Sequence, residues 1–175
     1  RNPLAAIEEA AQDVVFRAVE NGWNGPPFDP FELARILGIE VVPRAELRDA
    51  RTVPIGGGQV AIEYNPSRPR HRVRFSLAHE IAHTLFPDVA RVARYRSNLA
   101  AGSADEWQLE LLCNIAAAEL LMPTDTLPML QEGPLEIEEL MALRDKYGVS
   151  AEVLLRRATK LATYPVAMFA ASLAF

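Results

Sequence analysis

The stretch that decides the fold of this chain is RFSLAHEIAHTLF, residues 74–86. It contains two of the three histidines of the chain, His79 and His83, four residues apart. Residues at this spacing lie on one face of a helix about one turn apart, so both imidazoles can point to one metal ion. Glu80 lies about 100° around the same helix, too far to be a comfortable third ligand but able to reach a water on the metal. The stretch therefore predicts a metal-binding helix that also carries a general base.

The helix is predicted from about Val73 to Phe86, because no breaker interrupts this segment and Pro87 follows it. Four residues at helical spacing give it an apolar face: Phe75, Ala78, Ala82 and Phe86. A chance match to the histidine pattern usually lacks such a helical context. We therefore expect the two histidines to bind a metal ion.

A catalytic zinc ion takes three protein ligands and leaves one position open, so a third ligand is needed. The remaining histidine, His71, stands just before the helix and would have to fold back over its first turn. A carboxylate is the better choice, and the downstream carboxylates are Asp88, Asp105, Glu106, Glu110 and Glu119.

Glu110 and Glu106 both lie on a second helix, predicted from about Ala104 to Met122 and ended by Pro123. Glu110 falls on a largely apolar stripe with Trp107, Asn114, Ala117 and Leu121. A carboxylate in such a stripe needs a compensating charge, which a zinc ion supplies. Glu119 lies about half a turn from the stripe, and Glu106 about 40° from it. Spacing favours Glu110 and leaves Glu106 as the alternative.

The composition is that of a folded chain, since 50% of the 175 residues are hydrophobic and 23% are charged. The net charge of -5 argues against a protein that binds nucleic acid over its whole surface, because phosphate contacts need a basic face. The only cysteine, Cys113, is expected to be a small buried hydrophobe. Because no signal-like pattern and no apolar run near ~18 residues is present, we expect a cytoplasmic protein without a membrane span.

The rest of the chain contains further predicted helices and short strands, and the expected fold class is α+β. Helices are predicted within residues 2–22 and from Asp29-Pro30 to Gly38, and a strand is predicted in IEVVP, residues 39–43. VPIGGGQVAIEYN, residues 53–65, predicts two strands around a glycine turn. In the second strand Val60, Ile62 and Tyr64 alternate with Ala61 and Glu63, so this strand is expected to be half-exposed.

Two further helices, about Leu135–Tyr147 and Ala151–Ala162, are joined by YGVS and resemble a helix-turn-helix. The second helix opens with Ala151 and Glu152, which offer DNA no cation where base edges are normally met. We expect a packing or protein-binding role for this pair. The basic stretch SRPRHRVR, residues 67–74, lacks aromatic partners for stacking and is expected to be solvated surface, so direct nucleic-acid binding is not expected.

Two segments, in this order, resemble the ImmA/IrrE metallopeptidases. RFSLAHEIAHTLF is similar to the family's R-F-T-L-A-H-E-x-x-H helix, and ELLCNIAAAELLMP, residues 110–123, is similar to its E-x-x-A-N-x-F-A-A-x-L-L-M-P segment. Weaker similarities in DPFELARILGIEVV, GQVAIEYN and YGVSAEVLLRRATKL extend the resemblance over roughly residues 29–162. The chain departs from the family pattern at Ser76, Cys113, Ile115 and Ala116, none of which removes a ligand or the base.

The resemblance implies a zincin-like metallopeptidase domain over residues 1–130, with a small mixed or antiparallel sheet. A C-terminal helical extension, residues 131–175, would pack on it. The resemblance also implies that His79, His83 and Glu110 bind the metal, which selects Glu110 over Glu106, and that Glu80 is the catalytic base. Two histidines and one carboxylate suit Zn²⁺ well, with Mn²⁺ or Fe²⁺ as alternatives.

Substrate contacts follow from the same comparison. The strand QVAIEY, residues 59–64, precedes the metal helix as the edge strand does in zincin folds, so we expect it to hold an extended substrate by strand addition. Four residues are considered as donors to the tetrahedral intermediate, each with surface solvation or packing as the alternative role: His71, Tyr64, Arg72 and Arg74.

The resemblance implies a zinc-dependent endopeptidase that cleaves a protein, namely a helix-turn-helix transcriptional repressor, in a stress or mobile-element response. Two alternatives are a metal-containing module that acts on a repressor by contact alone, and a DNA-binding regulator that uses the C-terminal helix pair. Glu80 favours the peptidase over the binding module, because a purely structural metal site needs no base. The acidic net charge weighs against the DNA-binding regulator.

Overall fold

The computed structural model describes residues 2–86, 94–95 and 104–168, and for residues 94–95 and 104–106 it describes the backbone alone. The elements, in chain order, are α1 (Pro3–Glu20), α2 (Pro30–Ile36), β1 (Glu40–Pro43), β2 (Ala50–Gly56), β3 (Gln59–Tyr64), α3 (Arg70–His83), β4 (Arg94–Tyr95), α4 (Ala104–Leu121), the 3-10 helix η3 (Thr124–Thr126), α5 (Met129–Glu132), α6 (Ile137–Tyr147) and α7 (Ala151–Leu161). The mixture of helices with a small mixed sheet confirms the α+β, zincin-like prediction.

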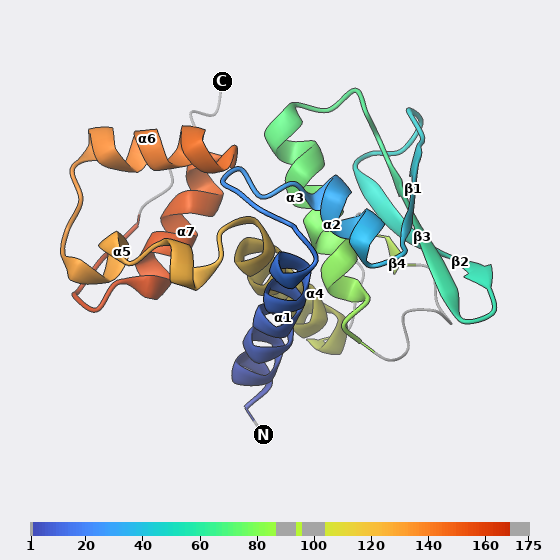
Figure 1. Cartoon of the computed structure of the whole chain (residues 1–175), viewed down its shortest axis with the longest axis horizontal. Coiled ribbons are helices and arrows are strands. Elements are labelled where there is room, and N and C mark those ends of the chain that lie inside the picture. The colour runs from blue at the N-terminus through green and yellow to red at the C-terminus, as the bar shows by residue number, and fades with distance from the viewer. Residues whose placement is uncertain (1, 87–93, 96–103, 169–175) are drawn as a thin grey trace.

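The sheet has the strand order β1-β3-β2-β4, in which β1 pairs with β3 in parallel and the remaining pairs are antiparallel. The sheet forms one end of the molecule, and the three long helices α1, α3 and α4 occupy its middle (Figure 1). The three glycines predicted as a turn, Gly56, Gly57 and Gly58, join β2 to β3 with positive φ angles, a conformation that side chains disfavour.

Two predictions for β3 are wrong. It is not an edge strand, because β1 and β2 flank it on both sides, so strand addition to β3 is excluded. It is also not half-exposed, since Ala61, Ile62 and Glu63 are all buried. The alternation of residue types predicted an exposed Glu63. In the structure Glu63 is buried and forms ion pairs with Arg44 (3.1 Å) and Arg51 (2.6 Å), which lie elsewhere in the sequence.

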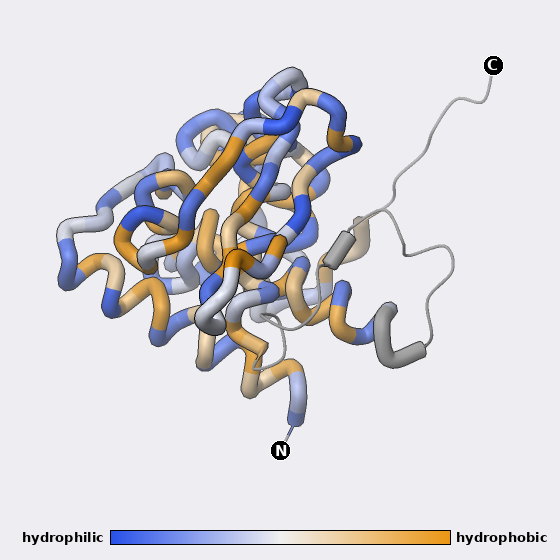
Figure 2. Tube along the Cα trace, turned by 90° about the vertical axis from the view of Figure 1, so that its right-hand side faces the viewer, coloured by the Kyte–Doolittle hydropathy of each residue, from blue (hydrophilic) through white to orange (hydrophobic). Residues whose placement is uncertain are grey.

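The helix α3 packs against both α4 and the sheet, and its residues from Ser76 to His83 are buried all the way around. It begins and ends three residues earlier than predicted. At the C-terminal end the Thr84 hydroxyl donates to the Ile81 carbonyl at 2.7 Å, which satisfies one of the last carbonyls of the helix. Hydrophobic and hydrophilic residues alternate along the helical turns of the trace (Figure 2).

The C-terminal helices α6 and α7 are joined as predicted. Gly148 ends α6 with a left-handed φ of 63°, and Ser150 caps α7 by accepting from the Val153 amide at 3.2 Å. Arg157 of α7 is buried and forms an ion pair with Glu119 of α4, which fastens this pair of helices to the rest of the fold. The division of the chain at residue 130 stays a prediction. Within the described ranges, none of the helices combines the length and hydropathy needed to cross a membrane.

Candidate metal centre

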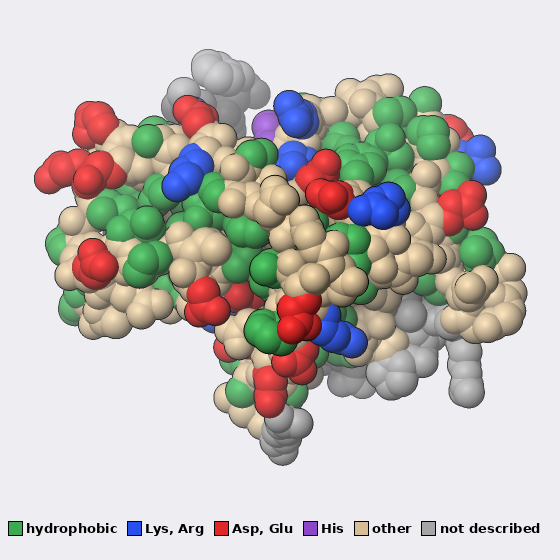
Figure 3. All heavy atoms as spheres, in the orientation of Figure 1, with side chains coloured by type: hydrophobic (Ala, Val, Ile, Leu, Met, Phe, Trp, Pro, Cys, Tyr) green, Lys and Arg blue, Asp and Glu red, His purple; other side chains and the backbone are tan. Residues whose placement is uncertain are grey.

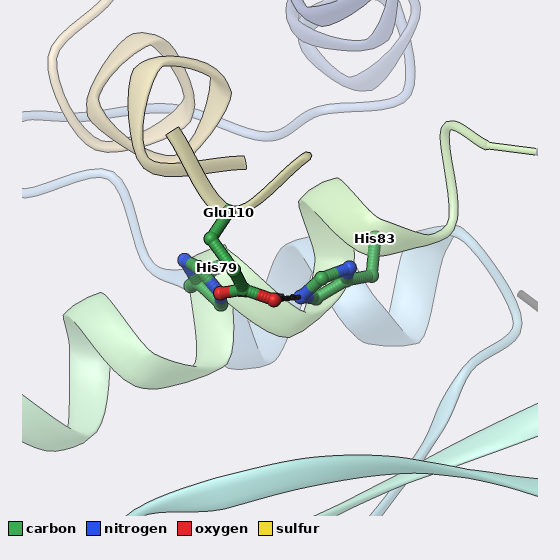
Figure 4. A group of neighbouring side chains, drawn as sticks. All are labelled: His79, His83 and Glu110. Carbon is green, nitrogen blue, oxygen red and sulfur yellow. Dashed lines mark hydrogen bonds and ion pairs between the residues drawn. The ribbon is translucent and has the colours of Figure 1, made fainter. Parts of the chain in front are cut away.

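Three side chains from α3 and α4 converge on one point in the interior (Figure 4). The Nε2 atom of His79 lies 3.0 Å from one carboxylate oxygen of Glu110, and the Nε2 atom of His83 lies 3.3 Å from the other. The two Nε2 atoms are 3.2 Å apart, and the ligating atoms of all three residues lie within 4.8 Å of one another. The predicted spacing on α3 thus places both imidazoles on one face, and α4 supplies the carboxylate.

Burial and charge make this cluster suited to a cation. His79 and His83 are 0% and 1% exposed, so water does not compensate the polar atoms of either ring. Burial raises the pKa of Glu110, but hydrogen bonds from the two histidines outweigh it and lower this pKa to about 2. Glu110 is therefore a carboxylate at neutral pH. Two ring nitrogens and one carboxylate, converging in a buried space, form the donor set that a divalent metal ion such as zinc requires.

The other nitrogen of each ring is held by a neighbouring residue of α4. His79 Nδ1 lies 3.0 Å from Asn114 Oδ1, and His83 Nδ1 lies 3.3 Å from the sulfur of Cys113. When Nδ1 of each ring carries the proton, Nδ1 donates to its neighbour on α4. The Nε2 atom then keeps its lone pair free to bind the metal. Cys113 is 0% exposed, as predicted, but it contacts a histidine and is not merely a hydrophobe. Its position three residues after Glu110 could have indicated this.

Glu80 directly follows His79 in α3 and contacts β2 of the sheet. Its side chain is fully buried, and Oε2 accepts a hydrogen bond of 2.8 Å from the hydroxyl of Thr52 on β2. The other oxygen, Oε1, is buried without a hydrogen-bond partner among the described residues. Burial raises the pKa of Glu80, opposed by His79 and His83 and by the Thr52 hydrogen bond. Because Glu80 directly follows His79 in α3, this unpartnered oxygen lies near the cluster.

Thr52 was not identified from the sequence. It lies 28 residues before Glu80, in a segment whose polar composition carried no recognisable motif. Only the packing of β2 against α3 brings the two residues together.

The other candidates for the third ligand are not placed in the cluster. Glu119 is occupied by Arg157 and by Thr124, whose amide it accepts at 2.9 Å. Asp88 and the side chains of Asp105 and Glu106 lie outside the described residues. The expected buried stripe on α4 is only partly buried, since Trp107 is 60% exposed.

The four residues considered as donors to a reaction intermediate either contact residues outside the cluster or are exposed at the surface. Arg74 donates to the backbone oxygens of Phe28 and Tyr147, and Arg72 donates to Asp49 at 2.5 and 2.8 Å. Tyr64 packs its ring edge-on against Phe31. His71 is exposed at the start of α3.

The sequence of residues 37–159 matches the family model Peptidase_M78, described as the IrrE N-terminal-like domain. The chain belongs to this family. The match covers most of the chain and includes all the residues of the cluster, which confirms the resemblance seen in the two motifs. The name of the model is that of a peptidase family. The geometry of His79, His83 and Glu110 adds a possible metal site within the matched residues. No curated protein matches the sequence.

Proposed function

We propose that this member of the IrrE N-terminal-like family is a zinc-dependent endopeptidase. The observation that carries the proposal is the pairing of two features at α3. One is the cluster of His79, His83 and Glu110, and the other is the buried, unpartnered Oε1 of Glu80 next to it. A metal site that served the fold alone would need no such carboxylate.

In this proposal His79, His83 and Glu110 hold the metal, and Asn114 and Cys113 orient the two imidazoles. A zinc ion bound there would polarise the peptide carbonyl and acidify the attacking water. Glu80 takes the proton of that water at Oε1, while Thr52 keeps Oε2 in place. Burial raises the pKa of Glu80, which favours its uptake of this proton, and the same carboxyl group then donates the proton to the leaving amine.

The substrate we propose is a protein, specifically a helix-turn-helix transcriptional repressor, cleaved in a stress or mobile-element response. The similarity of both motifs to the ImmA/IrrE metallopeptidases supports this choice. A role in DNA binding is disfavoured because acidic side chains gather over α6 on the face shown in Figure 3, among them Glu136, Glu138 and Glu139, which are exposed.

The test is incubation of the zinc-loaded protein with the repressor encoded beside its gene, followed by mass spectrometry. We expect one specific cut, lost in Glu80→Gln although that variant retains its zinc. Undiminished cleavage by Glu80→Gln would remove Glu80 as the base. A stable complex with an intact repressor would instead support a regulatory module that acts by contact.

A further inference from the structure

A cavity of about 540 Å³ lies beside the metal centre, between α3, α4 and α7. Two residues that line the cavity also neighbour His79. Asn114 is hydrogen-bonded to the His79 ring, and the centroids of the Phe75 and His79 rings lie 6.3 Å apart. From Phe75 the lining continues along α3 to Arg72 and His71. The cavity therefore begins one helical turn from a proposed metal ligand and leads away along the groove between α3 and α4.

The third wall of the cavity is α7, the second helix of the pair that resembles a helix-turn-helix. Ser150, Glu152 and Val153 at its start line the cavity, as do Arg156 and Lys160 further along. In a DNA-binding pair the start of this helix would meet base edges. Here the same end of the helix lines the cavity beside the metal centre.

We propose that this cavity binds the substrate segment next to the scissile bond and selects an apolar side chain together with an aspartate or glutamate. The inference rests on the proposed peptidase function and names the substrate class of that site. The apolar part of the lining is formed by Phe75, Leu111, Ile115, Ala118 and Val153, a surface suited to an apolar side chain.

The charged side chains of the described lining are mostly cationic, namely Arg72, Arg156, Arg157 and Lys160, and Glu152 is the one acid among them. Two of these cations are already engaged, since buried Arg157 pairs with Glu119 and Lys160 pairs with Glu8. They hold α7 in place and do not select a ligand.

Arg156 and Arg72 are the cations that can bind a substrate carboxylate. Among the described residues Arg156 pairs only with Glu152, at 3.0 Å, and both side chains are 66% exposed. Such an exposed pair contributes little to stability, so a substrate carboxylate can take the place of Glu152. Arg72 donates to Asp49 through Nε and Nη2, and its guanidinium has further N–H groups at the edge of the cavity.

The length of the cavity sets where the acidic residue lies in the substrate. Phe75 and His71 are four and eight residues before His79, which corresponds to about 6 and 12 Å along the helix axis. An extended peptide advances about 3.3 Å per residue. The carboxylate is therefore expected about two to four residues from the scissile bond, on one side only.

The first experiment maps cleavage preferences. The zinc-loaded protein is incubated with a mixture of synthetic peptides that samples Asp, Asn, Lys and Leu at every position, and the cuts are read by mass spectrometry. We expect Asp to be preferred over Asn by about tenfold at one of the positions named above, as for a charge-assisted hydrogen bond. In Arg156→Glu this preference should be lost through KM, with kcat little changed.

A matched control is Arg35→Glu on α2, because Arg35 is also an exposed arginine paired with a glutamate of its own helix. This variant should keep the preference for Asp. Cleavage without any preference for Asp, or an unchanged preference in Arg156→Glu, would overturn the inference and leave the peptidase function standing.

A second experiment does not depend on cleavage. Zinc-loaded Glu80→Gln is titrated into a fluorescein-labelled peptide of alternating leucine and glutamate, and into its leucine–glutamine counterpart, with anisotropy as the readout. We expect the glutamate peptide to bind about tenfold tighter at low salt, with the difference shrinking as salt rises and disappearing in the double variant with Arg156→Glu. Equal binding of the two peptides would overturn the inference. If no peptide is cut in the first experiment, the proposed function fails, while the binding result still decides the charge preference of the cavity.

Discussion

Thr52 of β2 donates its hydroxyl proton to Oε2 of Glu80, 2.8 Å away, across the interface between the sheet and α3. The sheet therefore fixes the orientation of the proposed base, and Oε1 is the oxygen left without a partner among the described residues. Thr52 and Glu80 are both 0% exposed, so no water competes for this hydrogen bond.

Replacing Thr52 by valine should lower kcat without loss of metal. The change keeps the shape of the side chain but removes the donor, so the Glu80 carboxylate is no longer held in one orientation. We expect kcat to fall about tenfold to a hundredfold, the range seen when partners that orient a site are removed. Steady-state kinetics and zinc content measure the two effects. Thr52→Ser keeps the hydroxyl and should retain most of the activity, and a fully active Thr52→Val would contradict the assigned role.

Replacing Glu110 by alanine should abolish stoichiometric zinc binding, because it removes the only carboxylate of the described cluster. Zinc content after dialysis, measured by atomic emission, is the readout. Glu106→Ala is the matched control, since it changes the same residue type one turn earlier on α4. If Glu106→Ala loses zinc and Glu110→Ala keeps it, the ligand assignment is wrong.

Cys113→Ala should weaken zinc binding by about tenfold, because the sulfur is the partner of His83 Nδ1. Competition with a chromophoric chelator at fixed pH gives the affinity, and circular dichroism checks that the fold is intact. Cys113→Ser preserves an acceptor at this position and should recover most of the affinity. An alanine variant that binds zinc as tightly as the wild type would show that the contact does not orient His83.

The ion pairs of Glu63 predict a pH dependence of stability. Burial raises the pKa of Glu63, but hydrogen bonds and charge from Arg51 and Arg44 outweigh it, so the pKa is lowered from 4.5. A carboxyl group with a lowered folded-state pKa stabilises the fold fully above its unfolded value, and this contribution is lost as pH falls through the folded value.

Urea unfolding of the wild type and Glu63→Gln measures this contribution. We expect a difference of about 1 kcal/mol at neutral pH, modest because the Arg44 side chain is 48% exposed and solvent screens its charge. The difference should shrink at pH values well below 4.5. Glu32→Gln, which removes only an exposed pair with Arg35, should change little at any pH. A pH-independent difference for Glu63→Gln would contradict the charge-based explanation.

The proposed metal centre was predictable where its parts are local in sequence. The spacing of His79 and His83 required only helical periodicity, and the structure places their Nε2 atoms 3.2 Å apart. The prediction of Glu110 as a ligand needed more information, because periodicity alone left Glu106 as an alternative. The family resemblance selected Glu110. The role of Thr52 could not be predicted from the sequence, since its contact with Glu80 depends on how the sheet packs against α3.

The sheet shows why a pattern of alternating residues is incomplete evidence for burial. Glu63 appeared to belong to a solvent-facing side of its strand because a carboxylate is rarely buried. Arg44, just after β1, and Arg51 of β2 neutralise it, and the alternation pattern of β3 does not include either residue. The same pattern also could not reveal that β3 lies between two other strands, because strand order depends on contacts between distant segments.

Glu110, Cys113 and Asn114 occupy one face of a single turn of α4, where one binds the proposed metal and two hold the imidazoles. A slip of α4 along α3 by one residue would remove all three contacts at once. Half-formed versions of the site are therefore disfavoured, and its assembly is all-or-none, coupled to the docking of one helix on another. Zinc that binds the completed site should in turn stabilise the docked arrangement of α3 and α4, because a ligand that binds only the assembled state shifts the population toward it.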